Sequence, residues 1–249
     1  MLIVAILEIL VCALVCVYLL KRKQGKPFSI GEAAKFIVLG MLSWLLLMFL
    51  PLEPRVFFNM SNPLAAGVLT ALLLAALPEE LSKYVFFRLG LIKDKQVQTW
   101  HDAILACVLV AAGFTFAEGI EYAFFGGANI VRAFVPAHLL FQIAMGYFFG
   151  KACVTKNAGN HVLSLAVPIV LHTLFDMFPI TLAASIGGDT SALSGLTSES
   201  LQSMPHYNLM LVGVGGTIVI SIVTVAALIV MVRKVGKWGK EGQKQDLLK

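Results

Sequence analysis

Ionisable side chains interrupt several long apolar stretches of this sequence of 249 residues. A charged side chain at the centre of a bilayer costs about 2.5 to 3.5 kcal/mol on insertion scales, so each of them needs a partner or a chemical task. Carboxylates and imidazoles can activate water, transfer protons and bind metal ions. The residues of this set are Glu79, Glu80, Lys83, Glu118, His138, His172 and Asp176.

The spacing of these residues predicts that they share helix faces. Side chains three or four residues apart lie on the same face of a helix. The pairs with this spacing are Glu79 or Glu80 with Lys83, Phe114 with Glu118, Glu118 with Tyr122, His138 with Gln142, and His172 with Asp176. Four consecutive apolar stretches therefore carry polar stripes, and these stripes can be buried only by facing one another around one interior cavity.

Such a cavity could hydrolyse a peptide bond with its own side chains. Glu79 or Glu80 could act as the general base toward a water molecule that attacks the scissile carbonyl. Lys83 could keep one of these glutamates ionised while the other titrates. His172 could donate a hydrogen bond to the developing oxyanion, with Asp176 orienting its ring.

A zinc site is the alternative use of the same residue types. Glu80, Glu118, His138 and His172 offer oxygen and nitrogen ligands that zinc accepts, and bound zinc would polarise the carbonyl and activate water directly. The sequence contains no H-E-x-x-H motif and no obvious pairing of a serine or cysteine with a histidine. Hydrolysis without a cofactor and hydrolysis with zinc both stay open on these observations.

The elements that position these residues are predicted to be membrane-spanning helices. The chain is 59% hydrophobic and only 13% charged, and its mean hydropathy of +0.87 is far from that of a soluble domain. Apolar runs of about 20 residues recur along the whole sequence. We predict an all-α bundle of seven spans, at residues 2–20, 34–50, 64–92, 103–125, 133–153, 162–186 and 208–232.

Three prolines lie beside the ionisable residues. Pro78 directly precedes Glu79, Pro136 lies two residues before His138, and Pro168 lies four before His172. Proline removes a backbone hydrogen bond and kinks a helix. We therefore expect kinks in these spans, which leave room for water in the cavity.

The distribution of basic residues predicts the orientation in the cell membrane. Cytoplasmic connections carry an excess of Lys and Arg. Basic residues cluster at Lys21, Arg22, Lys23 and Lys26, at Lys93 and Lys95, at Lys151 and Lys156, and in the tail 233–249, whereas the opposite connections carry only Arg55 and Arg132. The amino terminus is expected outside and the carboxyl terminus in the cytoplasm, with 187–206 as an extracytoplasmic loop. Residues 1–249 form a single membrane domain in this interpretation. The net charge of +5 comes mostly from these clusters between apolar runs, so we expect no nucleic-acid partner.

The order of the motifs resembles that of the PrsW family. The chain has E-E-x-x-K at Glu79 to Lys83, F-x-x-x-E ending at Glu118, then Arg132 and His138, and H-x-x-x-D at His172 to Asp176. This likeness extends over residues 78–178. The related CAAX prenyl protease group is similar in its double glutamate but has a histidine where this chain has Glu118, which favours the PrsW family.

The resemblance implies a multipass protease that cuts a single-pass membrane protein, as the founding members cut an anti-sigma factor on its extracytoplasmic side. It places six residues in the catalytic site and gives three others a supporting role. One departure is Gly119, where the family pattern leads us to expect an amide residue. The implied catalytic residues are Glu79, Glu80, Glu118, His138, His172 and Asp176, and the supporting residues are Lys83, Arg132 and Gln142.

Other interpretations compete with the protease. Chains of Glu, His and Asp also form proton relays in transporters and channels, but transporters often have two related halves, and this polar set is confined to spans three to six. Glu79 with Lys83 could be a structural ion pair. Glu8 has the pattern of a packing residue, and Glu121 that of a solvated or structural one. The double glutamate beside a proline favours the protease over these.

Overall fold

The computed structural model of the protein describes residues 2–23, 27–53, 55–92, 94, 97–125, 135–188 and 202–241. Every regular element longer than one residue in these ranges is a helix. Seven of the helical segments are long and apolar enough to cross a membrane, which confirms the predicted bundle. The elements are α1 Leu2–Arg22, α2 Ile30–Leu47, α3 Pro63–Thr70, η1 Ala71–Ala76, α4 Leu77–Gly90, α5 Trp100–Phe125, α7 Ala137–Thr155, α8 Ala158–Ser185 and α10 Tyr207–Glu241.

Polar residues set the beginning of three helices. The Ser29 hydroxyl accepts a hydrogen bond from the backbone of Glu32 at the start of α2. The side chain of Asn62 caps α3, with Pro63 in the first turn, where a missing N–H costs nothing. Asn157 caps α8 by accepting from the backbone of Gly159 at 2.8 Å. Each cap satisfies a backbone donor that has no partner inside its own helix.

The third span is one rod with a π-helical turn, η1, in its middle. A proline in an α-helix lacks a donor and clashes with the carbonyl four residues earlier. Pro78 comes just after η1, where Leu77 bonds to the carbonyl of Leu72 five residues back. This wider turn accommodates the proline and presents Leu74 to the interior. The predicted distortion beside Glu79 therefore takes the form of a π-helical turn.

Two expectations at helix ends need correction. Pro136 does not kink a helix, because it occupies the N-cap position of α7, which begins at Ala137. The last span does not end near residue 232, because α10 continues through the basic segment to Glu241. Pro168 lies inside α8 as expected, together with Pro179. Most of the predicted loop 187–206 and the end of the tail lie outside the described residues.

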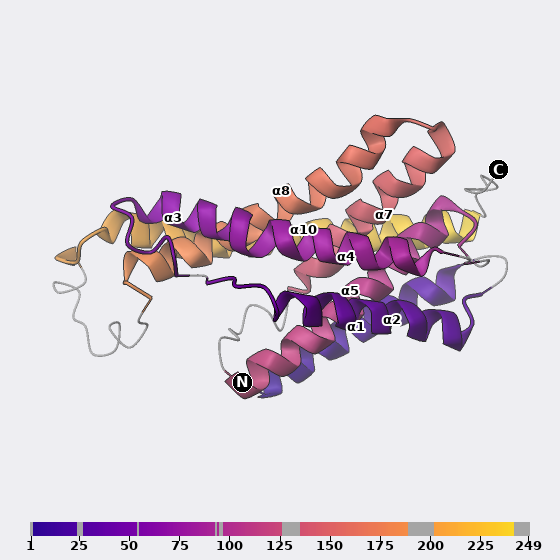
Figure 1. The fold of residues 1–249 in the computed structure, drawn as a ribbon, viewed down its shortest axis with the longest axis horizontal. Helices are drawn as coiled ribbons and strands as arrows, with labels where there is room; N and C mark the ends of the chain where they lie inside the picture. Colours follow the sequence, from indigo (N-terminus) through magenta and orange to yellow (C-terminus); the bar gives the residue numbers. More distant parts are fainter. Residues whose placement is uncertain are drawn as a thin grey trace.

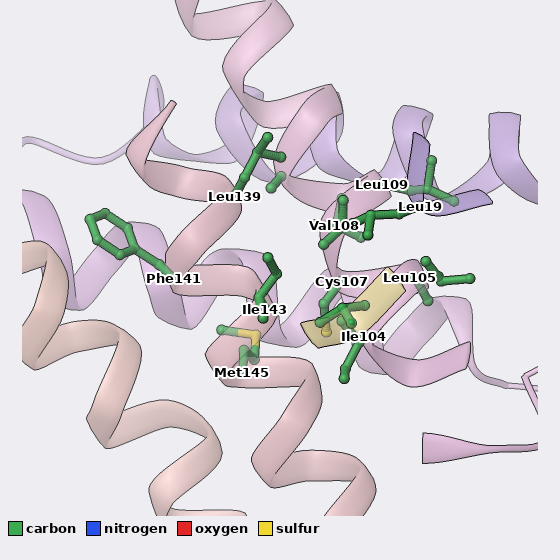
Figure 2. Close-up of a cluster of buried hydrophobic side chains, with 14 of the residues drawn as sticks. Leu19, Ile104, Leu105, Cys107, Val108, Leu109, Leu139, Phe141, Ile143 and Met145 are labelled. Atoms are coloured by element: carbon green, nitrogen blue, oxygen red, sulfur yellow. The ribbon is translucent and has the colours of Figure 1, made fainter. Parts of the chain in front are cut away.

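Helix α5 is the centre of the bundle and contacts α1, α2, α4 and α7. In Figure 1, α3, η1 and α4 form one long rod that runs beside α8, and α8 also contacts α10. Figure 2 shows the apolar core, in which Leu19 of α1, Val108 of α5 and Ile143 of α7 belong to one buried cluster. The ionisable residues lie beyond this core, between α4, α5, α7 and α8.

The contact between α3 and α8 depends on Gly67. A Cβ atom at this position would lie 2.1 Å from Thr181 Oγ1 and 2.7 Å from the carbonyl oxygen of Met177. We expect Gly67→Ala to lower the free energy of unfolding by about 1 to 3 kcal/mol, the usual cost of overpacking. Gly215→Ala is the control, since its Cβ meets nothing within 4 Å. Thermal unfolding in detergent checks this, and equal stability of the two variants would contradict it.

Candidate active site

The ammonium of Lys83 lies at the centre of the polar cluster. Its Nζ lies 2.8 Å from Glu80 Oε1, 3.2 Å from Glu79 Oε2 and 3.1 Å from His138 Nδ1. The ring of Phe114 also lies against the ammonium, with its centroid 3.8 Å from Nζ. An ammonium has three N–H donors, and these three acceptors match them. The side chain is fully buried.

Each of the two histidines is backed by a carboxylate. His138 Nε2 lies 3.0 Å from Glu118 Oε2, and because its Nδ1 accepts from Lys83, the ring is expected to donate to Glu118. His172 Nε2 lies 3.0 Å from Asp176 Oδ2, and its Nδ1 lies 3.0 Å from Glu80 Oε1. The carboxylates therefore fix the orientation of both rings, whose centroids are 5.2 Å apart.

Glu79 and Glu80 are adjacent in sequence but have different surroundings. Both oxygens of Glu80 are engaged, since Oε1 contacts Lys83 and His172 and Oε2 accepts from Gln142 Nε2 at 2.7 Å. Its side chain is fully buried, whereas that of Glu79 is 15% exposed. Glu79 lines the neighbouring cavity, and Glu80 does not.

The cavity beside Glu79 has a volume of about 340 Å³ and lies between η1, α5, α7 and α8. Both histidines and their two carboxylate partners line it, and so does Glu8 of α1. From the cluster it extends along η1 to Thr70, the last residue of α3, and along α8 to Ala183. A substrate in this cavity would therefore meet Glu79 and the two imidazoles.

A second cavity, of about 310 Å³, lies toward the end of α2. The two cavities share four lining residues, so both open on Glu79 and Glu118. Tyr122 donates a hydrogen bond of 3.2 Å to Glu118 Oε1 at this junction. The second cavity has both polar and apolar walls, and the residues that line it alone are Trp44, Leu47, Met48, Leu50, Leu52, Phe114 and Glu121.

Most of the predicted site residues come together in the structure. Arg132 lies outside the described residues, so its position is not part of the site described. Gly119, the departure from the family pattern, faces Ala5 and Ile9 of α1, so a side chain at this position would point away from the cluster. The residues that meet are Glu79, Glu80, Lys83, Glu118, His138, Gln142, His172 and Asp176.

Two residues of the site were missed by the sequence reasoning. Glu8 is buried and lines the first cavity, and its signal was a carboxylate inside an apolar span. Phe141 stacks on His172 with ring centroids 4.9 Å apart and packs edge-on against His138. It lies three residues after His138, so helical spacing placed it on the same face. An apolar residue in an apolar helix gave no further signal.

A divalent metal matches the residue types of this cluster but not its contacts. Glu79, Glu80, His138 and His172 each offer one ligand atom, and these atoms lie within 4.8 Å of one another. Imidazoles backed by carboxylates are common around zinc. However, a neutral imidazole has one acceptor nitrogen, and that of His138 already faces Lys83 Nζ. The cluster as arranged therefore does not fit a metal ion.

Comparisons with known proteins agree with the order of the motifs. Residues 29–196 match the PrsW family intramembrane metalloprotease. The chain is 28% identical over 170 residues to Protease PrsW of Halalkalibacterium halodurans, covering 66% of this chain and 77% of that protein. It is 32% identical over 155 residues to Protease PrsW of Clostridioides difficile, covering 57% of this chain and 64% of that protein. No solved structure matches.

The family match covers more than half of the chain and includes α2 to α8, which carry the polar cluster. It excludes α1 and therefore Glu8. Together with seven helices able to span a membrane, it favours hydrolysis over the transporter interpretation. The protein is a multi-pass membrane protease and belongs to the PrsW family.

Proposed function

We propose that the protein cuts a single-pass, anti-sigma-factor-like membrane protein near its extracytoplasmic face, with Glu79 as the general base. The observation that carries the choice of base is that Glu79 opens on both cavities, whereas Glu80 is enclosed by Lys83, Gln142 and His172. A general base must reach the water that it activates. Glu80 is then the residue that holds the cluster together.

The reaction follows from this placement. Glu79 takes a proton from a water molecule in the cavity, and the resulting hydroxide attacks the scissile carbonyl carbon. His172 lines the same cavity, with Nε2 3.9 Å from Glu79 Oε2 and 3.0 Å from Asp176 Oδ2. Its Nε2–H, shared with Asp176, also donates to the oxyanion that forms. When the C–N bond breaks, Glu79 returns the proton to the leaving amine. Asp176 keeps the His172 ring in position throughout.

The membrane orientation supports cleavage on the outer side. In the orientation predicted from the basic connections, the start of α3 and the end of α8 are expected outside. The first cavity extends from Glu79 toward these ends, at Thr70 and Ala183. A substrate segment just outside or at the edge of the membrane can therefore enter it. Such a segment has to be extended, because the carbonyls of a helix are already hydrogen-bonded along the chain.

The experiment that tests this function uses a single-span substrate, reconstituted with the protease in liposomes. Mass spectrometry of the products locates the cut, and added external protease reports on which side of the membrane the products lie. The proposal predicts one cut at or just outside the outer end of the substrate span. A cut at the cytoplasmic end would refute the proposed topology, and no cut in several such substrates would refute the substrate class.

The two cavities on either side of Glu79 and Glu118 also predict a preference next to the cut. An extended substrate that crosses this junction would place one side chain in the second cavity, at the end of α2. We expect Leu47→Trp to fill that cavity and to lower kcat/KM roughly tenfold to 200-fold for a substrate with Phe beside the scissile bond. A substrate with Ala there should be little affected.

The matched control is Leu45→Trp, because Leu45 lies on the same helix, is 43% exposed and lines neither cavity. Rates for the two substrates and the two variants give the comparison. Equal losses with the Phe and Ala substrates would mean that the second cavity does not select the neighbouring side chain.

A further inference from the structure

We infer that the ammonium of Lys83 takes the place of a divalent metal in this site, so that this member of a metalloprotease family works with a cation of its own. The inference rests on the proposed function, because it assigns the cation of the same site. The Lys83 ammonium lies where the candidate metal ligands converge.

A metal ion bound by these residues would compete with Lys83 Nζ for the same position. Zinc lies about 2.0 to 2.2 Å from its oxygen and nitrogen ligands. An ion bound to Glu80 Oε1 and His138 Nδ1 would occupy the space in which Lys83 Nζ lies, 2.8 and 3.1 Å from these same atoms. Glu79 Oε2, a further candidate ligand atom, lies 3.2 Å from the same ammonium. An ammonium and a divalent cation at such separations repel each other strongly.

The ring nitrogens of both histidines already have partners within the cluster. His138 directs Nδ1 to Lys83 and Nε2 to Glu118, so its single acceptor nitrogen is used. His172 directs both of its nitrogens to carboxylates, at 3.0 Å from Glu80 Oε1 and from Asp176 Oδ2. A metal could bind either ring only by displacing one of these contacts. The two imidazoles are therefore committed to the cluster of side chains.

The surrounding side chains match the hydrogen-bond donors and the charge of the Lys83 ammonium. Its three donors face three acceptors, and the ring of Phe114 lies beside the ammonium, with its centroid 3.8 Å from Nζ. A ring face attracts a cation, most strongly where water is excluded. The site thus supplies an ammonium with complete coordination. In this arrangement Lys83 acts through Glu79 and Glu80, as a positioning residue that holds both carboxylates in place.

Direct zinc binding tests the inference without any substrate. The purified full-length chain, stripped with a chelator and dialysed against zinc, is expected to retain no stoichiometric metal. Lys83→Met removes the ammonium and frees three acceptors, so it is expected to bind one zinc ion at least about tenfold more tightly than wild type. Lys83→Arg keeps the charge and is expected to behave like wild type. Adding His138→Ala to Lys83→Met should abolish the new site.

The outcomes are distinct from those of the proposed function. One tightly bound zinc ion per wild-type chain, lost in His138→Ala, would overturn the inference even if cleavage is observed. A folded Lys83→Met variant that gains no zinc affinity would overturn it as well. If Lys83→Met does not fold, the wild-type measurement decides alone. Failure of cleavage with every substrate would instead count against the proposed function and leave the zinc result standing.

Discussion

Glu79→Gln is expected to lower kcat about 100-fold to 10,000-fold, the usual contribution of a general base, with little change in stability. Glutamine has nearly the same shape as glutamate, and its side-chain oxygen can still accept a hydrogen bond from Lys83. It cannot take a proton from water. Because the side chain is at the edge of the cluster and 15% exposed, the loss of its charge should disturb the fold only slightly.

Rates with a reconstituted substrate and thermal unfolding in detergent measure the two halves of this prediction. Glu32→Gln is the matched control, since it makes the same chemical change in the first turn of α2, outside both cavities. It should retain full activity. A Glu79→Gln variant with wild-type kcat would assign the base to another residue, and one that fails to fold would give Glu79 a structural role.

Glu80→Ala is expected to inactivate the protein by destabilising it. Removing one partner of a buried ion pair costs about 3 to 5 kcal/mol, because it leaves an uncompensated charge. Here it would leave the fully buried Lys83 without its shortest contact, and Gln142 Nε2 and His172 Nδ1 without their acceptor. The loss of unfolding free energy should exceed that of Glu79→Ala, whose side chain is partly exposed.

A double variant separates the buried charge from simple loss of packing. Glu80→Ala combined with Lys83→Met removes both charges, so it should recover part of the stability lost in Glu80→Ala alone. Activity should stay absent in both. Denaturation in mixed micelles gives the free energies of unfolding of wild type, of each single variant and of the double variant. If the stability lost in the double variant equals the sum of the losses in Glu80→Ala and Lys83→Met, the two residues are not coupled. The central role of the pair would then be wrong.

The helical bundle could be predicted because a bilayer leaves few choices. Backbone groups in lipid have to bond within their own segment, so apolar stretches of sufficient length become helices. The same constraint predicted that the polar faces of four spans would meet, and Glu80, His138 and His172 do so. Spacing of four residues also gave the pair His172 and Asp176 correctly.

The choice between Glu79 and Glu80 was not available from the sequence. Neighbouring residues on a helix point about 100° apart, so one of the two had to face the cluster more directly, but which one depends on how α4 is rotated. The π-helical turn η1 changes this rotation just before Pro78. Spacing along an ideal helix therefore could not assign the two roles.

Other details depended on contacts between distant segments. Glu8 had no ionisable neighbour in its own span, so nothing in the sequence linked it to a cavity formed by α5, α7 and α8. Whether these residues bind zinc also depends on contacts between distant segments. The sequence showed the ligand types, but only the position of Lys83 Nζ between Glu79, Glu80 and His138 shows what occupies their centre.

The most direct test of the central claim is cleavage of a single-span substrate in liposomes by wild type and by Glu79→Gln, at matched amounts of folded protein. Wild type is expected to cut the substrate, and Glu79→Gln is expected to lose at least about 99% of this rate. Equal rates for the two proteins would contradict this expectation, because the carboxylate that opens on the cavity would then have no part in activating water.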